Sequence, residues 1–225
     1  MKNLVIIPAR CGSKGIPDKN IISICGLPLI AHTIKNIPKS EKNHVIVSTD
    51  CEKIKSVAQR YGAEVPFLRP KSLALDNSKS IDFILHAINF YINKGHYFDS
   101  VILLQPTTPL RSSSDINQAI SQFKEAGSDS LISVYQEDYI NDLVMYKKNE
   151  RVLEPINANH NKGVRRQDHG EVFVRNGAIY ITKVSYLLEY EQIISDKPAH
   201  YIMSKYSSIN IDNYEDLDLA RKLMC

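Results

Sequence analysis

The chain has 225 residues, of which 43% are hydrophobic and 24% are charged, and its formal net charge is +3. This length allows one substantial core, and the composition excludes extensive disorder. The small net charge, with no basic stripe interleaved with aromatic residues, excludes a nucleic-acid-binding module. No apolar run approaches the roughly 18 residues of a transmembrane helix, so we expect no membrane partner.

Apolar periodicity and turn residues predict strands that alternate with helices. In chain order, the expected strands are residues 4–7, 45–49, 63–67, 100–104, 131–135 and 178–182. The expected helices are residues 28–37, 52–61, 80–93, 115–126 and 214–224. We expect Asp50 to cap the second helix. Continuous apolar strands in this alternation predict a mostly parallel sheet flanked by helices, a Rossmann-like α/β fold, in a single domain over residues 1–225.

Residues 137–172 interrupt the alternation with a long polar segment. A loop of this length inside a compact domain usually carries a function or an interaction. Its LVMY and VLEPI fragments are candidates for an exposed hairpin, which a second copy of the protein would stabilise by covering it. We therefore expect a dimerisation arm in this region.

The four cysteines, at positions 11, 25, 51 and 225, form neither a CxxC pair nor a zinc-binding spacing. Scattered free thiols are typical of proteins in a reducing cytosol. The N-terminal apolar run is shorter than the hydrophobic region of a secretory signal peptide. Together these features predict a cytoplasmic protein.

The stretch PARCGSKGIPDKN, residues 8–20, follows the first expected strand. In open α/β sheets ligands bind beyond the carboxyl ends of the strands, where this loop would lie. Its glycines let backbone amides turn toward an anion, and Arg10, Lys14 and Lys19 would neutralise that anion. The loop matches neither the Walker pattern nor the dinucleotide-binding fingerprint. It indicates either a site for a polyanion such as a triphosphate or a solvated, charged turn.

Seven segments occur together in the chain: IIPARCGSKGIPDKN, VIVSTD, FLRP, LLQPTTPLR, RRQD, NGAIYIT and IMSKYSSINID. In this order they resemble the sugar-acid cytidylyltransferases, in particular the CMP-N-acylneuraminate (CMP-sialic acid) synthetases. The likeness covers essentially the whole chain, and the combination is far more specific than any single segment. It implies a nucleotidyltransferase fold, a homodimer joined through the arm, and Mg²⁺ as cofactor. The implied reaction transfers a cytidylyl group from CTP to the anomeric hydroxyl of a nine-carbon keto-sugar acid and releases pyrophosphate.

The resemblance implies a nucleotide site in the first half of the chain. Its expected members are Arg10, Gly12, Ser13, Lys14, Lys19, Asn20, Arg69, Asp76 and Ser78. Arg10 and Lys14 would also act in catalysis, because a leaving pyrophosphate gains charge in the transition state. Arg69 is best placed to donate to an acceptor on cytosine. The alternative for Asp76 is a cap on the helix expected from Ser80.

The resemblance implies that Gln105 binds the sugar acid and takes part in catalysis. Arg165 and Arg166 would pair with the sugar carboxylate, because a guanidinium matches a planar carboxylate in two hydrogen bonds. The alternative for this pair is an exposed basic loop. Asn176 is a further sugar-binding candidate, and Arg111 is as readily structural as functional. No histidine falls in a core motif, so we assign no general base.

Mg²⁺ prefers oxygen ligands, typically one or two carboxylates completed by phosphate oxygens and water. The family pattern near the end is two aspartates separated by one residue, where this chain has Asn210 and Asp212. On a strand these two side chains would point the same way. Asp212 is therefore the expected catalytic metal ligand. Asn210 offers only a neutral carbonyl, which leaves open whether one or two metal ions bind.

The resemblance makes N-acetylneuraminic acid the expected substrate. The alternative is the same reaction on a related nonulosonic acid, such as legionaminic or pseudaminic acid, because these acids differ in substituents that the motifs do not report. A remote alternative is a nucleotide-binding protein without catalysis. Asn210 keeps that alternative open, whereas the joint presence of the first loop, Gln105 and Asp212 opposes it.

Overall fold

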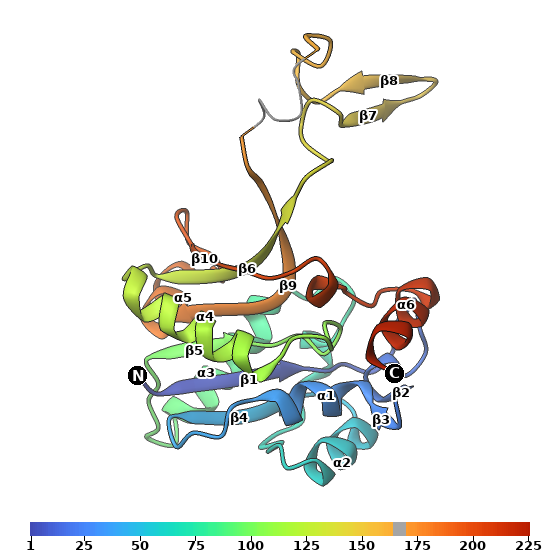
Figure 1. The fold of residues 1–225 in the computed structure, drawn as a ribbon. Coiled ribbons are helices and arrows are strands. Elements are labelled where there is room, and N and C mark those ends of the chain that lie inside the picture. Colours follow the sequence, from blue (N-terminus) through green and yellow to red (C-terminus); the bar gives the residue numbers. More distant parts are fainter. Residues whose placement is uncertain (164–169) are drawn as a thin grey trace.

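The computed structural model describes residues 1–163 and 170–225. Within them, six strands form one sheet in the order β10-β6-β9-β5-β1-β4 (Figure 1). These strands are β1 (Asn3–Pro8), β4 (Asn43–Ser48), β5 (Ser100–Leu103), β6 (Ser130–Glu137), β9 (Val172–Lys183) and β10 (Ala199–Ile202). Only β9 runs antiparallel to its neighbours, β5 and β6. The predicted mostly parallel sheet is therefore confirmed.

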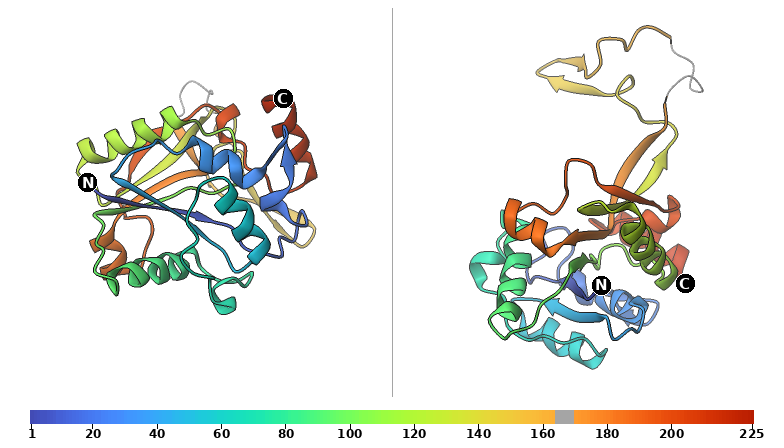
Figure 2. Two further views of the ribbon diagram at one scale, coloured as in Figure 1. Left: turned by 90° about the horizontal axis from the view of Figure 1, so that it is seen from below. Right: turned by 90° about the vertical axis from the view of Figure 1, so that its left-hand side faces the viewer.

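Helices cover both faces of the sheet (Figure 2). They are α1 (Leu29–Asn36), α2 (Glu52–Arg60), α3 (Ser80–Ile92), α4 (Ser113–Ala126), α5 (Val184–Tyr190) and α6 (Tyr214–Met224). The first core, with α1, α2 and α4, contains Val5 and Ile7 of β1. The second core, with α3 and α5, contains Leu4 and Ile6 of the same strand. Successive residues of a strand point to opposite faces, so Leu4–Ile7 of β1 form a continuous apolar run because both faces of the strand are buried.

Short elements lie beyond the carboxyl ends of the strands. Strands β2 (Ser23–Ile24) and β3 (Leu27–Pro28) pair with each other, and 3₁₀ turns occur at η1 (Lys19–Ile21), η2 (Lys71–Leu73) and η4 (Tyr206–Ser208). A third apolar cluster joins Ile16 and Ile24 from this region to Ile211 and Leu217 near the C-terminus. This cluster brings the end of the chain against the loop that follows β1.

The described part of the polar segment that follows β6, residues 138–163, projects away from the body (Figures 1 and 2). It carries an antiparallel hairpin of β7 (Tyr146–Asn149) and β8 (Val152–Pro155). The predicted hairpin is thus confirmed, although its first strand begins at Tyr146, where the LVMY fragment ends. Apolar side chains are exposed along this arm: Tyr139, Ile140, Val144, Met145, Tyr146, Val152, Leu153 and Ile156. A role of the arm in dimerisation stays a prediction.

Two local predictions were wrong. Residues 63–67 make one isolated bridge, between Glu64 and Ile46 of β4, rather than a strand. Pro66 lies in this segment, and a proline has no amide hydrogen to donate to a ladder. Asp50 does not cap α2: the N-cap residue is Cys51, and no side chain of the described residues caps that helix. The Asp50 carboxylate instead accepts a hydrogen bond from the backbone N–H of Cys11.

The expectation of four free thiols was also wrong, because Cys25 and Cys225 form a disulfide across 200 positions of sequence. The third apolar cluster brings these two residues together, and no local pattern reports that. Cys11 and Cys51 are free. A hydrogen bond between their side chains, together with burial, raises the pKa of Cys11 to about 12, so this thiol is protonated and weakly nucleophilic at neutral pH. Among the described residues, no helix combines the length and the apolar character that crossing a bilayer requires.

Candidate active site

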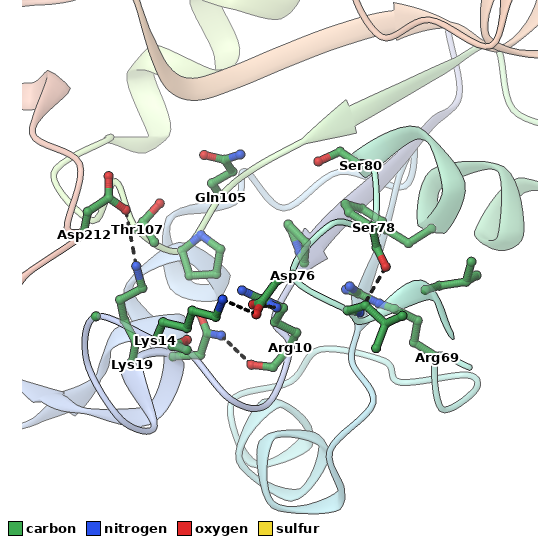
Figure 3. A pocket seen from close by; sticks show the side chains of 18 of the residues that line it. Arg10, Lys14, Lys19, Arg69, Asp76, Ser78, Ser80, Gln105, Thr107 and Asp212 are labelled. Carbon is green, nitrogen blue, oxygen red and sulfur yellow. Dashed lines mark hydrogen bonds and ion pairs between the residues drawn. The ribbon is translucent and has the colours of Figure 1, made fainter. Parts of the chain in front are cut away.

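A cavity of about 440 Å³ lies at the carboxyl ends of β1 and β5 (Figure 3). This volume is typical of small-molecule sites. The expected site residues that line it are Arg10, Ser13, Lys14, Lys19, Asn20, Arg69, Asp76, Ser78, Gln105, Asn210 and Asp212. They come from loops far apart in the sequence, which meet because parallel strands end at the same edge of the sheet.

The loop after β1 presents its cations to the cavity. Arg10 Nη1 lies 2.6 Å from Asp76 Oδ1, and Lys14 Nζ lies 2.6 Å from Asp76 Oδ2. The hydrogen bonds from Lys14 and Arg10 lower the pKa of Asp76. The Asp76 carboxylate thus already pairs with both of the cations that would neutralise a bound phosphate chain. The alternative that Asp76 caps α3 is wrong, because the N-cap residue of that helix is Lys79.

The far end of the same loop rests on the segment that contains Asp212. Lys19 Nζ donates to the backbone oxygen of Ile211 at 2.8 Å and lies 3.4 Å from Asp212 Oδ1. A Cβ atom built on Gly15 would overlap the backbone oxygen of Asp212. Glycine is therefore required at position 15 for this close approach.

Three other residues of the loop were expected to bind nucleotide. Asn20 is buried, lines the cavity, and donates from Nδ2 to the backbone oxygen of Arg10 at 3.2 Å. Ser13 lines the cavity, whereas Gly12 does not. Gly12 has φ of 70°, a left-handed conformation that glycine adopts without strain, so it serves the turn of the loop.

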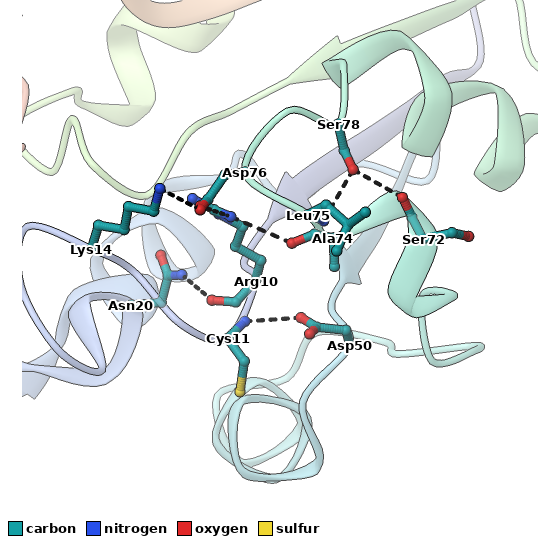
Figure 4. Close-up of polar contacts among 10 residues, drawn as sticks. All are labelled: Arg10, Cys11, Lys14, Asn20, Asp50, Ser72, Ala74, Leu75, Asp76 and Ser78. Carbon is teal, nitrogen blue, oxygen red and sulfur yellow. Dashed lines mark hydrogen bonds and ion pairs between the residues drawn. The ribbon is translucent and has the colours of Figure 1, made fainter.

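Arg69 forms a buried wall of the cavity. Its guanidinium donates to the hydroxyl and to the backbone oxygen of Ser48 and lies 4.4 Å from the centre of the Phe83 ring. Burial lowers the pKa of Arg69 to about 10, against the nearby charge of Asp50, so the group stays charged at neutral pH. Ser78 accepts from the backbone N–H of Leu75 and donates to the backbone oxygen of Ser72, which closes the turn beside Asp76 (Figure 4).

Replacing Asp76 by asparagine is expected to tighten the binding of CTP. The change removes the carboxylate that competes for Arg10 and Lys14, and exposed ion pairs of this kind change affinity by about two- to fivefold. Isothermal titration of CTP into both proteins measures the effect. Weaker binding by Asp76→Asn would contradict the competition and would indicate that Asp76 contacts the nucleotide directly.

Gln105 directly follows the strand β5 and its continuation at Leu104. A Cβ atom at Gly177 would lie 3.0 Å from Gln105 Oε1, so the side chain of Gln105 lies over this glycine. The loop behind it is held by Arg111, whose Nη1 donates to the backbone oxygens of Gln105 and Ala178 at 3.3 and 2.6 Å. Arg111 is buried, and its burial lowers its pKa. Its role is therefore structural.

The structure places Asn176 away from the cavity. Its Nδ2 donates to Ser208 Oγ at 2.8 Å, and its Oδ1 accepts from Ser133 Oγ at 2.6 Å. This buried network joins β6, β9 and η4. Arg165 and Arg166, expected at the sugar carboxylate, lie outside the described residues.

Asn210 and Asp212 both line the cavity, from an irregular segment rather than a strand. Asn210 Nδ2 donates to Asp212 Oδ2 at 2.6 Å, while Asn210 Oδ1 is buried and has no hydrogen-bond partner among the residues that the structure describes. An unpartnered amide oxygen beside a carboxylate is the donor chemistry that Mg²⁺ takes when phosphates and water complete its shell. No group of three or more histidine, cysteine or acidic side chains suited to a metal occurs in the described part of the chain. These two residues therefore fit a magnesium ion that arrives with a nucleotide.

Sequence reasoning missed several residues of the cavity wall. Ser80 and Phe83, from the first turn of α3, line the cavity, as does Thr107 after β5. The backbone oxygen of Thr107 also accepts a hydrogen bond from the backbone N–H of Ile211 at 2.8 Å, which ties the Gln105 loop to the Asp212 segment. Ser80 ends the LALDNSKS segment, and its position at the start of the expected helix was the one feature that could have placed it in the site.

Comparison with known proteins agrees with this geometry. The cytidylyltransferase family model matches residues 4–224. The pseudaminic acid cytidylyltransferase of Campylobacter jejuni subsp. jejuni (strain 81-176) is 33% identical, over 99% of this chain and 96% of that protein. The CMP-N,N'-diacetyllegionaminic acid synthase of Legionella pneumophila (strain Philadelphia 1) is 34% identical, over 100% of this chain and 97% of that protein.

Two further matches extend the comparison. The N-acylneuraminate cytidylyltransferase of Escherichia coli O18:K1:H7 is 34% identical, over 97% of this chain and 51% of that protein. The solved structure of a CMP:2-keto-3-deoxy-manno-octonic acid synthetase complexed with CTP has a TM-score of 0.73 at 18% identity, covering 100% of this chain and 98% of that one. The family match and the curated relatives make this chain a nucleotidyltransferase enzyme. Within that class, the chain belongs to the cytidylyltransferase family.

Proposed function

We propose that this enzyme transfers the cytidylyl group of CTP to the anomeric hydroxyl of a nine-carbon keto-sugar acid of the sialic type and releases pyrophosphate. The observation that carries the proposal is that Arg10, Lys14 and Lys19 line one cavity together with Asp212. The sugar oxygen forms a bond to the α-phosphorus, the bond from that phosphorus to the pyrophosphate oxygen breaks, and water takes up the hydroxyl proton. Pyrophosphate gains charge as it departs, so fixed cations lower the barrier.

The walls of the cavity suggest how the rest of the nucleotide binds. A guanidinium has five N–H groups, and the contacts of Arg69 with Ser48 use only part of them. Arg69 therefore retains donors for an acceptor on the base, and Phe83 holds its guanidinium plane. Ser13, Asn20 and Ser78 are the proposed polar contacts with the remainder of the nucleotide, with Gly12 shaping the loop. Asp76 belongs to the proposed nucleotide site as the carboxylate that holds Arg10 and Lys14 until the phosphates bind.

We assign the sugar acid to the side of the cavity that Gln105 lines. The position of Gln105 over Gly177 supports this assignment. Arg165 and Arg166 stay the proposed partners of the sugar carboxylate. Asn176 supports the site through Ser133 and Ser208 rather than through the sugar.

Mg²⁺ is the proposed cofactor, with Asp212 as carboxylate ligand and Asn210 Oδ1 as a neutral ligand. When bound, the ion would shield phosphate charge and lower the pKa of a hydroxyl close to it. Lys19 holds the Asp212 segment in place through the backbone oxygen of Ile211.

N-acetylneuraminic acid is the first substrate we propose, with legionaminic and pseudaminic acids as alternatives. The relatives named for the three acids are 33–34% identical to this chain, so identity does not choose between them. Asn210 keeps a non-catalytic nucleotide-binding protein as the remote alternative.

We also propose a homodimer and a cytoplasmic location. The exposed apolar side chains of the arm support the dimer, because a second copy would cover them. The free Cys11 and Cys51 support the location, whereas the Cys25–Cys225 disulfide opposes it. A molar mass from light scattering decides the first point, and a monomer would contradict it.

The test of function is pyrophosphate release with CTP and Mg²⁺ against N-acetylneuraminic, legionaminic and pseudaminic acids. ATP, GTP and UTP serve as nucleotide controls, and EDTA removes the metal. We expect release with CTP and one acid, and none with EDTA. Absence of release with every acid, from folded protein that still binds CTP, would contradict this activity on the three acids and favour the non-catalytic alternative.

A further inference from the structure

One peptide unit, between Arg10 and Cys11, joins the sheet to the phosphate loop. The ladder between β1 and β4 ends just before it, where the N–H of Ala9 donates to the backbone oxygen of Ser48 at 3.0 Å. The Arg10–Cys11 peptide lies two peptide units further along the chain. Its orientation therefore sets the direction in which the loop leaves the sheet.

Side chains bind both polar ends of this peptide (Figure 4). Asn20 Nδ2 donates to the oxygen of Arg10 at 3.2 Å, and Asp50 Oδ1 accepts from the N–H of Cys11 at 2.9 Å. These two contacts oppose each other across one rigid plane, because the peptide bond does not rotate freely. They hold the plane as a clamp.

The position of Asp50 is not explained by the helix that follows it. An aspartate before a helix commonly caps it, yet α2 begins at Glu52 with Cys51 as N-cap residue and, within the described residues, without a side-chain cap. The carboxylate of Asp50 reaches across to the loop after β1 instead. A hydrogen bond from a backbone N–H to a carboxylate is among the stronger contacts available to a loop.

We infer that Asp50 is a positioning residue of the active site, which holds the phosphate-binding cations in place through the Cys11 amide. The inference rests on the proposed function, since it assumes that Arg10 and Lys14 bind the triphosphate. The other end of the loop is fixed by Gly15 and Lys19 against the Asp212 segment. Loss of the Asp50 contact frees the near end, where Arg10 is attached.

Asp50 also acts on Arg69 through its charge, independently of its hydrogen bond to the Cys11 amide. Its charge raises the pKa of Arg69, which burial lowers, so Asp50 also acts on the base-binding wall by charge alone. Asparagine at position 50 keeps an oxygen acceptor for the Cys11 N–H and removes the charge. Alanine removes both, and serine is too short to reach the amide.

The experiment compares Asp50→Ala, Asp50→Asn and Asp50→Ser with the unchanged protein. CTP binding is measured by calorimetry, turnover by pyrophosphate release, and opening of the loop by hydrogen exchange of peptides that span residues 9–14. We expect alanine and serine to weaken CTP binding by about tenfold, the size expected for one lost hydrogen bond to a charged group, and to speed exchange at the Cys11 amide. Asparagine is expected to restore both within about threefold.

Glu52→Ala is the matched control, because it removes an acidic side chain two positions away that pairs only with Lys55 among the described residues. Unchanged CTP binding and unchanged exchange in alanine and serine variants would overturn the inference. Equal losses in the asparagine and alanine variants would also overturn it, since charge rather than the acceptor would then matter. Failure of the unchanged protein to bind CTP would contradict the proposed function, while hydrogen exchange would still test the clamp.

Discussion

Replacing Arg10 by alanine is expected to lower kcat for pyrophosphate release by about 10²–10³-fold, the usual effect of removing one group that stabilises transition-state charge. Arg10 lines the cavity and forms a 2.6 Å ion pair with Asp76, so its guanidinium already holds a carboxylate where the phosphates would bind. Steady-state kinetics with CTP and the accepted sugar acid measure the effect. Lysine at this position should recover part of the rate, because it keeps the charge but not the planar fork.

The control for this change is Arg60→Ala. Arg60 is exposed at the end of α2, and its loss alters the net charge equally without touching the cavity. A folded Arg10→Ala protein with kcat within threefold of the unchanged enzyme would exclude Arg10 from the reaction. A rise in the KM for CTP alone would limit Arg10 to binding.

Replacing Gly15 by alanine is expected to lower kcat/KM by about 100-fold, the cost of displacing reacting groups by roughly 1 Å. The added methyl group would overlap the backbone oxygen of Asp212, which is a main-chain atom and cannot rotate aside. Either the phosphate loop or the proposed metal ligand must therefore move. The measurement is turnover at saturating and limiting CTP, together with the melting temperature.

Gly170→Ala provides the comparison, because a Cβ atom there meets no atom of the described residues within 4 Å. Its activity and melting temperature should equal those of the unchanged protein. If Gly15→Ala also kept full activity, the close approach of the loop to Asp212 would have no part in catalysis. If it lost stability in proportion to activity, the approach would serve folding rather than the site.

The local sequence pattern predicted a helix or strand correctly where the residues of that element alone decide its structure. The helix α4 ends at Ala126, one residue before Gly127, which adopts the left-handed conformation that glycine favours at helix ends. The strand β1 was predicted from its apolar run alone, because it is buried on both faces. Local pattern failed for residues 63–67 and for the antiparallel direction of β9, since pairing partners decide both.

The sequence predicted many of the residues that line the candidate site, but not the contacts that these residues make with one another. The loop after β1, Gln105 and Asp212 were expected at the carboxyl edge, and the cavity contains them. The buried network around Asn176 was not expected, because an asparagine in a strand shows no sign of whether it faces a cavity or Ser133. The pairing of Asp76 with Arg10 was not expected either, since three strands and two α-helices separate the two residues in the chain.

The amino-acid sequence alone was enough to predict the alternation of strands and helices, the cations of the first loop and the oxygen-bearing side chains of Asn210 and Asp212 beside them. These follow from residue type and spacing, which act over a few positions. Only the tertiary structure decided that Asp50 holds the Cys11 amide, that Gly15 touches the Asp212 backbone and that Cys25 bonds to Cys225. Such contacts depend on distances between segments that are remote in the chain, and the packing of the whole core sets those distances.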